Sequence, residues 1–455
     1  MWAGGRLKRL ASFPCCSVEE RSDLKAEPEI SITPDSIPRS QAPGHWLRLG
    51  ETTRQVGMLF SAQTGAMIAG LIVSMIQARW MEPVEMGRFA FCITVVIVTS
   101  IFFEFGIFSA GARVLALEHD DKAQRQALGA LVLMTAAISL GFALFIAAIA
   151  VPVDMFFEKD VRWLLVATAA LAFFQPFQFF IEQACQGLNQ IRLLSVFNLL
   201  TSGFYLLLLI GFALAHTLTA GVALGAYLGG IALATIWMIA RLRPNFHGMS
   251  RYVRLTMSEA RGYGLNLYLA RITGIVSARS DQLVIAKLLT GTAPLGIYAI
   301  AQKFGNPVAM LGRSLAVSRF RAFASLARVP SRIIKWNAFL VIASSLALVV
   351  FGPLAIKIAF PKYIAGAPLI LPFAVMNLFI GLYQPYNCFL ASHGRGAEIR
   401  NVVFVVTAAS VGGLILTVPR FGLAGAAWTG AAVMALDYVL YLYYYQKFRR
   451  TLKDG

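Results

Sequence analysis

The chain has 455 residues, of which 58% are hydrophobic and only 14% are charged, and its mean hydropathy is +0.68. Soluble domains carry roughly 45–50% apolar and about 25% charged residues. The composition therefore excludes a water-soluble enzyme, a disordered protein and a collagen-like fibre, and it indicates a polytopic membrane protein. The net charge of +18 does not require nucleic acid as a partner, because lysine and arginine also mark cytoplasmic loops.

Residues 1–47 are polar, contain five prolines and show little periodicity, which predicts a disordered cytoplasmic tail. This stretch has no apolar core of the kind found in a signal peptide, so the chain is expected to begin on the cytoplasmic side. The five cysteines offer neither a disulfide framework nor the spacing of a metal site.

Twelve apolar stretches follow, each long enough to cross a hydrocarbon core of about 30 Å as a helix. They are predicted at 55–77, 89–112, 127–151, 161–183, 191–215, 220–240, 262–288, 294–318, 334–358, 364–390, 399–419 and 422–445. The sequence therefore predicts an all-α fold of about twelve transmembrane helices.

Lysine and arginine are distributed unevenly between the two sides of this predicted bundle. With the amino terminus inside, the inner loops and flanks hold about 22 of them and the outer loops about 8. The positive-inside rule then places both termini in the cytoplasm.

An internal duplication is visible in the sequence, because three short anchors recur about 200 residues apart. The anchor pairs are 87–90 with 296–299, 184–187 with 391–394, and 221–229 with 422–430. Each half then carries six spans, and the halves share one orientation. The predicted organisation is a tail at 1–47, an N-terminal six-helix lobe at 48–243, a cytoplasmic linker at 244–261, and a C-terminal lobe with a short cytoplasmic tail at 262–455.

Cations inside the seventh and eighth spans are the main candidates for a ligand site, since an ionised group at mid-bilayer costs about 2.5–3.5 kcal/mol on insertion scales. Helical spacing places the two arginines of the seventh span on one stripe, and Gln302, Asn306 and Arg313 on one stripe of the eighth span with Lys303 beside it. These candidate substrate-binding residues are Arg271, Arg279, Gln302, Lys303, Asn306 and Arg313. Their natural ligand is an anion. The structural alternative pairs Arg279 with Asp281 or Glu104 and leaves Arg313 at the inner membrane interface.

Carboxylates inside the spans are candidates for coupling transport to an ion, with Glu104 and Asp281 as the residues of choice. Burial favours the protonated form of a carboxylate and a nearby arginine favours the ionised form. The duplication makes Glu104 equivalent in position to Arg313, which suggests a pair between them across the lobes. The alternative for each is a structural ion pair within its own lobe.

Enzymatic motifs are absent from the sequence: it has no HExxH, GxSxG, P-loop or GxGxxG pattern, and its five histidines are scattered. No catalytic residue, cofactor or metal is therefore expected. The predicted outer loops are also short, whereas a membrane glycosyltransferase would house its active site in a larger extramembrane element. Both features favour transport over chemistry.

Several short motifs, in order and with matching spacing, give the sequence a family resemblance. They are 78–79 with 82–83 and 86–90, 104–107 with 112–113, 281–285 with 295–298 and Lys303, and 422–427. From Thr52 to Lys447 the sequence resembles the polysaccharide-export, or oligosaccharide flippase, branch of the multidrug/oligosaccharidyl-lipid/polysaccharide (MOP) flippase superfamily. The tail of 47 residues departs from the family's usual compact start.

The resemblance implies two six-helix lobes in a V shape around a cationic cavity for a polyprenyl-diphosphate-linked oligosaccharide. Such a protein would move this lipid across the bacterial inner membrane by alternating access, for O-antigen (lipopolysaccharide), capsule or exopolysaccharide synthesis. The expected partners are the lipid-linked oligosaccharide, the bilayer, H⁺ or Na⁺ as a coupling ion, and polysaccharide polymerases. The alternatives are a cation-coupled multidrug exporter of the same superfamily and, further off, a polytopic polymerase or glycosyltransferase.

Overall fold

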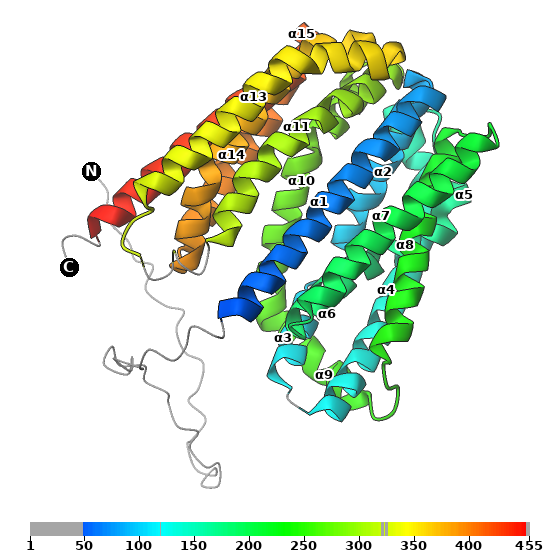
Figure 1. Cartoon of the computed structure of the whole chain (residues 1–455). Helices are drawn as coiled ribbons and strands as arrows, with labels where there is room; N and C mark the ends of the chain where they lie inside the picture. The colour runs from blue at the N-terminus through cyan, green and yellow to red at the C-terminus, as the bar shows by residue number, and fades with distance from the viewer. Residues whose placement is uncertain (1–48, 119, 320–322, 324–325, 452–455) are drawn as a thin grey trace, which may run out of the picture. The chain divides into compact units, whose positions relative to one another are not determined.

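The computed structural model describes residues 49–118, 120–319, 323 and 326–451 (Figure 1). The predicted tail at 1–47 lies outside these residues. The chain divides into the units Met1–Gly50 and Glu51–Gly455, and the helical bundle belongs to the second unit. The described residues of this unit form helices joined by short turns, with no strand among them. The predicted all-α fold is confirmed.

The first half of the unit contains six membrane-spanning segments, two of which are built from a pair of shorter helices. The helices are α1 (Leu49–Trp80), α2 (Pro83–Phe102) with α3 (Ile107–Leu117), α4 (Asp121–Phe157), α5 (Arg162–Ala172) with α6 (Gln175–Gly187), α7 (Ile191–Leu214) and α8 (Ala220–Leu242).

The second half follows a short helical connection and again supplies six segments. The connection consists of α9 (Ser250–Glu259) and the π-helical turn η2 (Ala260–Gly264). The spans are α10 (Leu265–Leu288), α11 (Ala293–Ser318), α13 (Ser331–Ala359), the 3₁₀ segment η3 (Pro361–Leu369) with α14 (Ile370–Ser392), and α15 (Gly396–Thr451), which provides two.

Eight helices of the described chain are long and apolar enough, by length and composition, to cross a membrane. The protein is therefore a multi-pass integral membrane protein. The difference from the twelve predicted spans has two causes. α15 holds two predicted spans but counts once, and α1, α10 and α11 are more polar along their length.

α15 is two antiparallel arms rather than one long rod. The backbone reverses at Gly422, where φ is 59° and ψ is −136°. Thr417 and Thr429, twelve residues apart, then face each other with their hydroxyl oxygens 2.7 Å apart. This combination of angles is accessible essentially only to glycine, so the predicted spans 399–419 and 422–445 meet without an intervening loop.

The second predicted span, 89–112, is wrong as a single helix, because the structure breaks it between α2 and α3. Phe105 and Gly106 adopt φ of 48° and 72° at the break. A Cβ on Gly106 would overlap the backbone of Gly264, so only glycine permits this close approach of α3 to the start of α10. The break places Glu104 at the interface between the halves.

The apolar core shows where the halves join. Helices α2, α10 and α11 carry contacts across the halves. One buried cluster contains residues of both halves, including Phe91, Phe142, Tyr298 and Phe373. Two other buried clusters lie near the opposite end of the bundle, one confined to residues 107–260 and the other to residues 316–445. The end of the bundle at which the two halves share one buried cluster also holds Lys159, in the turn between α4 and α5, and we call it the Lys159 end. The opposite end of the bundle is called the α9 end.

Candidate functional site

A cavity of about 920 Å³ lies between the two halves. Its walls come from α1, α2, α7 and α8 on one side and from α10, α11 and α14 on the other. A second cavity of about 550 Å³ adjoins it and shares Asn306, Arg313 and Ile380. Together they form a central cavity reached by residues from both duplicated halves.

Three cations line the larger cavity, and no aspartate or glutamate is among its described lining residues. Arg279 comes from α10, whereas Lys303 and Arg313 come from α11. The amides of Gln302 and Asn306 lie on the same wall. Five of the six predicted ligand-binding residues are thus brought together, because spacings of three and four residues place them on one face of each helix.

Lys303 is held by groups from the first half. Its ammonium donates to the Gln77 side-chain oxygen at 3.3 Å, and the Gln77 amide donates to the Tyr205 hydroxyl at 2.9 Å. Gln77 is fully buried. Sequence reasoning missed Gln77 and Tyr205; the signal was an amide at the last position of the first predicted span.

Arg271, the sixth predicted residue, is not among the residues that line the cavity. Its guanidinium forms an ion pair with the fully buried Glu104, with Nη1 2.7 Å from Oε1. It also lies over the ring of Phe179, 5.5 Å from the centroid. The predicted pairing of Glu104 with Arg313 is wrong: the carboxylate does pair across the halves, but with an arginine of α10.

Asp281 lies in a polar network beside the cavity. Its carboxylate accepts hydrogen bonds from the Tyr298 hydroxyl and the Gln302 amide, both at 2.9 Å, and from the backbone N–H of Gln282 at 2.7 Å. The Gln282 side chain donates to Gln302 at 3.1 Å and accepts a short hydrogen bond from Thr94 of α2. The network therefore connects the cavity wall of the second half to the first half.

Neutral polar groups line the smaller cavity. They come from α6, α7 and α14 and face Asn306 and Arg313 of α11. These residues are Gln178, Asn198, Thr201, Ser202, Tyr383 and Gln384. Such groups donate and accept hydrogen bonds without a net charge, which suits hydroxyl-rich ligands.

The Lys159 end is closed by contacts between the halves. The Lys159 ammonium donates to the carbonyl oxygens of Leu289 at 2.7 Å and Gly291 at 2.8 Å. Its side chain is buried, and burial lowers the pKa of Lys159 below its ordinary value; the Glu158 carboxylate opposes this shift and Lys287 adds to it. Lys362 of η3 also pairs with Glu82 at 2.7 Å.

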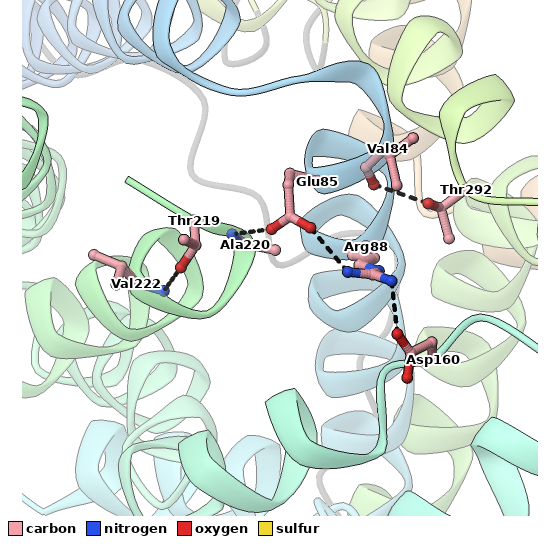
Figure 2. Close-up of polar contacts among 8 residues, drawn as sticks. All are labelled: Val84, Glu85, Arg88, Asp160, Thr219, Ala220, Val222 and Thr292. Atoms are coloured by element: carbon pink, nitrogen blue, oxygen red, sulfur yellow. Dashed lines mark hydrogen bonds and ion pairs between the residues drawn. The ribbon is translucent and has the colours of Figure 1, made fainter. Parts of the chain in front are cut away.

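The start of α2 organises this closed end, as Figure 2 shows. The Glu85 carboxylate accepts from the Arg88 guanidinium at 2.9 Å and from the first backbone N–H of α8, at Ala220, at 2.8 Å. Arg88 reaches on to Asp160 at 2.6 Å, and Thr292 of the second half donates to the Val84 carbonyl at 2.8 Å. A carboxylate at a helix N-terminus is favourable, so α2, α8 and the turn after α4 are fixed together.

A family model identifies the protein family to which this chain belongs. The model of the family described as "Polysaccharide biosynthesis protein" matches residues 52–311. The chain belongs to this family. Among curated proteins, none matches the sequence significantly.

Solved structures show which fold this family member shares. The lipid II flippase MurJ in an inward closed conformation matches with a TM-score of 0.68 at 12% identity, over 87% of this chain and 89% of MurJ. The MATE multidrug transporter DinF-BH matches with a TM-score of 0.65 at 11% identity, over 90% of this chain and 98% of the transporter. An inward-facing multidrug resistance MATE transporter of the MOP superfamily matches with a TM-score of 0.60 at 16% identity, over 87% of this chain and 95% of the transporter. The predicted resemblance to the MOP superfamily is confirmed.

Proposed function

We propose that the protein is a flippase that moves a polyprenyl-diphosphate-linked oligosaccharide across the bacterial inner membrane for surface polysaccharide synthesis. The family affiliation and the shared fold with the lipid II flippase support a transporter of a lipid-linked saccharide. The observation that carries the proposal is the central cavity with three cations and no carboxylate on its described walls.

A diphosphate fits this cavity for a physical reason. Phosphate oxygens that leave water pay a large desolvation cost, which charge-assisted hydrogen bonds from arginine and lysine offset. Arg279 and Lys303 lie on adjacent helices of the larger cavity, and Arg313 lies where the two cavities join. The proposed site therefore holds the diphosphate between α10 and α11.

The sugars would occupy the smaller cavity. Its amide and hydroxyl groups on α6, α7 and α14 are suited to hydroxyl-rich units, and it adjoins the cations through Asn306 and Arg313. The polyprenyl chain would stay in the bilayer. This division separates the charged, the polar and the apolar parts of one substrate.

Transport would follow alternating access, with lobes 48–243 and 262–455 moving about the linker 244–261. We take the Lys159 end as external and the α9 end as cytoplasmic, with both termini inside, from the distribution of lysine and arginine. The closed Lys159 end and the separate apolar clusters at the α9 end suit a substrate that enters from the inner leaflet. Asp281 and Glu104 remain the candidate coupling carboxylates for H⁺ or Na⁺.

A cation-coupled multidrug exporter is the second candidate, because MATE transporters share the fold. Such an exporter would bind cationic drugs with carboxylates, whereas the charged residues on the described walls of the larger cavity are all cations. The flippase is therefore expected to bind an anionic ligand, and the exporter a cationic one.

Gene deletion followed by extraction of polyprenyl-linked oligosaccharides tests the proposal. We expect one such lipid to accumulate on the inner leaflet, and the wild-type gene to reverse this where an Arg279→Ala, Lys303→Ala variant does not. Normal lipid pools together with increased sensitivity to cationic drugs would overturn the flippase and support the exporter.

A further inference from the structure

A separate cationic pocket of about 800 Å³ lies at the α9 end of the first half. The beginning of α4, the turn between α6 and α7, and the end of α8 enclose it. All its lining residues fall between 121 and 242, so no residue of the second half contributes. The pocket is therefore distinct from the central cavity.

Three arginines from three different helices converge on this pocket. Arg125 comes from α4, Arg192 from α7 and Arg241 from α8. None of them forms an ion pair with a carboxylate in the described part of the chain, and the pocket's one acidic lining residue is Asp121. Clustered like charges repel one another, so an anion bound among them would stabilise this arrangement.

A second pocket of about 600 Å³ adjoins the first and extends the positive charge. It shares Asp121 and Arg125 with the first pocket and adds the cations Lys122 and Arg243. Arg125 thus stands between two basic pockets. A ligand with two anionic groups a short distance apart would occupy both at once.

Apolar residues line the first pocket one helical turn from each arginine. These residues are Leu128, Val196 and Trp237. On α8, the exposed face continues from Trp237 to Ile236 and Leu233, which are 57% and 45% exposed. A tryptophan at the end of a span is typical of the membrane interface, and exposed leucine and isoleucine below it are typical of contact with lipid chains.

We propose that these two pockets bind an anionic membrane phospholipid, with a lipid that carries two phosphates, such as cardiolipin, as the preferred ligand. Arginine binds phosphate oxygens bidentately, and basic pockets between helices near the membrane surface bind such headgroups. One phosphate lies among Arg125, Arg192 and Arg241. The other lies near Lys122 and Arg243, and the acyl chains run along Trp237 and α8.

Native mass spectrometry of the purified full chain, with defined lipids added in detergent, tests the proposal. We expect cardiolipin to bind more tightly than phosphatidylglycerol, and phosphatidylcholine not to bind specifically. The triple variant Arg125→Gln, Arg192→Gln, Arg241→Gln should lower the affinity for cardiolipin about 100-fold. The control Arg251→Gln, Arg254→Gln, Arg400→Gln removes three exposed arginines outside both pockets and should retain the wild-type affinity.

Single-site variants at Arg192 and two competing ligands complete the test. If the triple glutamine variant does not fold, the charge-conserving Arg192→Lys and the single variant Arg192→Gln replace it, and the glutamine should weaken binding more than the lysine, which keeps the charge but not the bidentate contact. Sodium pyrophosphate and a polyprenyl diphosphate are added as competitors to distinguish a phospholipid from free phosphate or from the transport substrate. Equal affinity in the triple variant and the control, or displacement of cardiolipin by either competitor at equimolar concentration, would overturn the proposal.

Discussion

Gly87 and Gly296, which occupy equivalent places in the duplicated sequence, lie against each other's helices in a reciprocal contact. A Cβ on Gly87 would overlap the carbonyl oxygen of Thr292, and one on Gly296 would overlap that of Pro83. Thr292 precedes Gly296 by four residues, as Pro83 precedes Gly87. The contact is thus self-complementary, as in an interface around a two-fold axis, and the axis passes between α2 and α11 near the closed end.

Substitution of either glycine should prevent this close approach. We expect Gly87→Ala and Gly296→Ala each to destabilise the closed end by about 1–3 kcal/mol, because the backbones must separate to admit a methyl group. Thermal unfolding in detergent and polysaccharide export in a deletion strain measure the effect. Gly225→Ala on α8 is the matched control, since no atom lies within 4 Å of its added Cβ. An unchanged unfolding midpoint in both variants would contradict the role assigned to the contact.

Removal of the cavity cations should impair transport without loss of protein. Arg279→Ala and Lys303→Ala each remove a cation from the cavity wall, and we expect the flipping rate to fall at least about tenfold, given the strength of hydrogen bonds to charged groups. Proteoliposomes that contain a fluorescent lipid-linked oligosaccharide provide the measurement. Arg420→Ala, an exposed arginine of α15 outside the described cavities, should behave as wild type. Wild-type rates in both cavity variants would remove the anion site.

Arg271 should behave differently, because its guanidinium neutralises Glu104. Arg271→Gln leaves a buried carboxylate without its ion-pair partner, and we expect a loss of about 3 kcal/mol in stability and a lower protein level. The double variant Glu104→Gln, Arg271→Gln removes both charges and should recover most of that stability. A double-mutant cycle on unfolding midpoints isolates the coupling. If the double variant is as unstable as the sum of the single ones, the pair contributes nothing of its own.

The buried ammonium of Lys159 should make the stability of the closed end depend on pH. Its pKa is lowered in the folded protein, so the folded state releases this proton at a lower pH than the unfolded chain does. The folded state binds fewer protons in that interval, and its stability therefore rises with pH up to the ordinary pKa of 10.5. We expect the difference in unfolding midpoint between wild type and Lys159→Met to grow between pH 7 and pH 10. A constant difference would show that the amine does not titrate in this range.

Cysteine labelling tests the topology. In a variant whose five cysteines are replaced by serine, Glu158→Cys should react with a membrane-impermeant maleimide added to intact cells, and Ser250→Cys should react only after the cells are opened. Both side chains are exposed in the structure, so the reagent reaches each once it is on the correct side. The reverse pattern would place the α9 end outside and invert the proposed direction of transport.

Hydropathy and helical spacing were sufficient to predict the spans and most of the cavity face. Arg279 and Lys303 could be placed because residues three or four apart on a helix share a face. The same rule failed for Arg271. It lies two turns from Arg279, about 12 Å along the helix, so it shares the face but not the depth, and it meets Glu104 instead of the cavity.

The break after α2 could not be predicted, because it depends on a contact distant in sequence. Gly106 takes a left-handed conformation against Gly264, and that contact turns Glu104 toward α10. The equivalence of Glu104 with Arg313 assumed a continuous helix, which the break invalidates. The burial of Lys159 could not be predicted either, since it depends on the carbonyl groups of residues 289 and 291.

The reversal of α15 at Gly422 limits where a protease can cut the chain at the Lys159 end. Proteases preferentially cut the chain at exposed loop tips. Between the two arms of α15 there is no such loop, because one glycine makes the whole turn and the Thr417 and Thr429 hydroxyls hold the arms together next to it. A protease added on that side should cut elsewhere and leave residues 396–451 as one intact fragment.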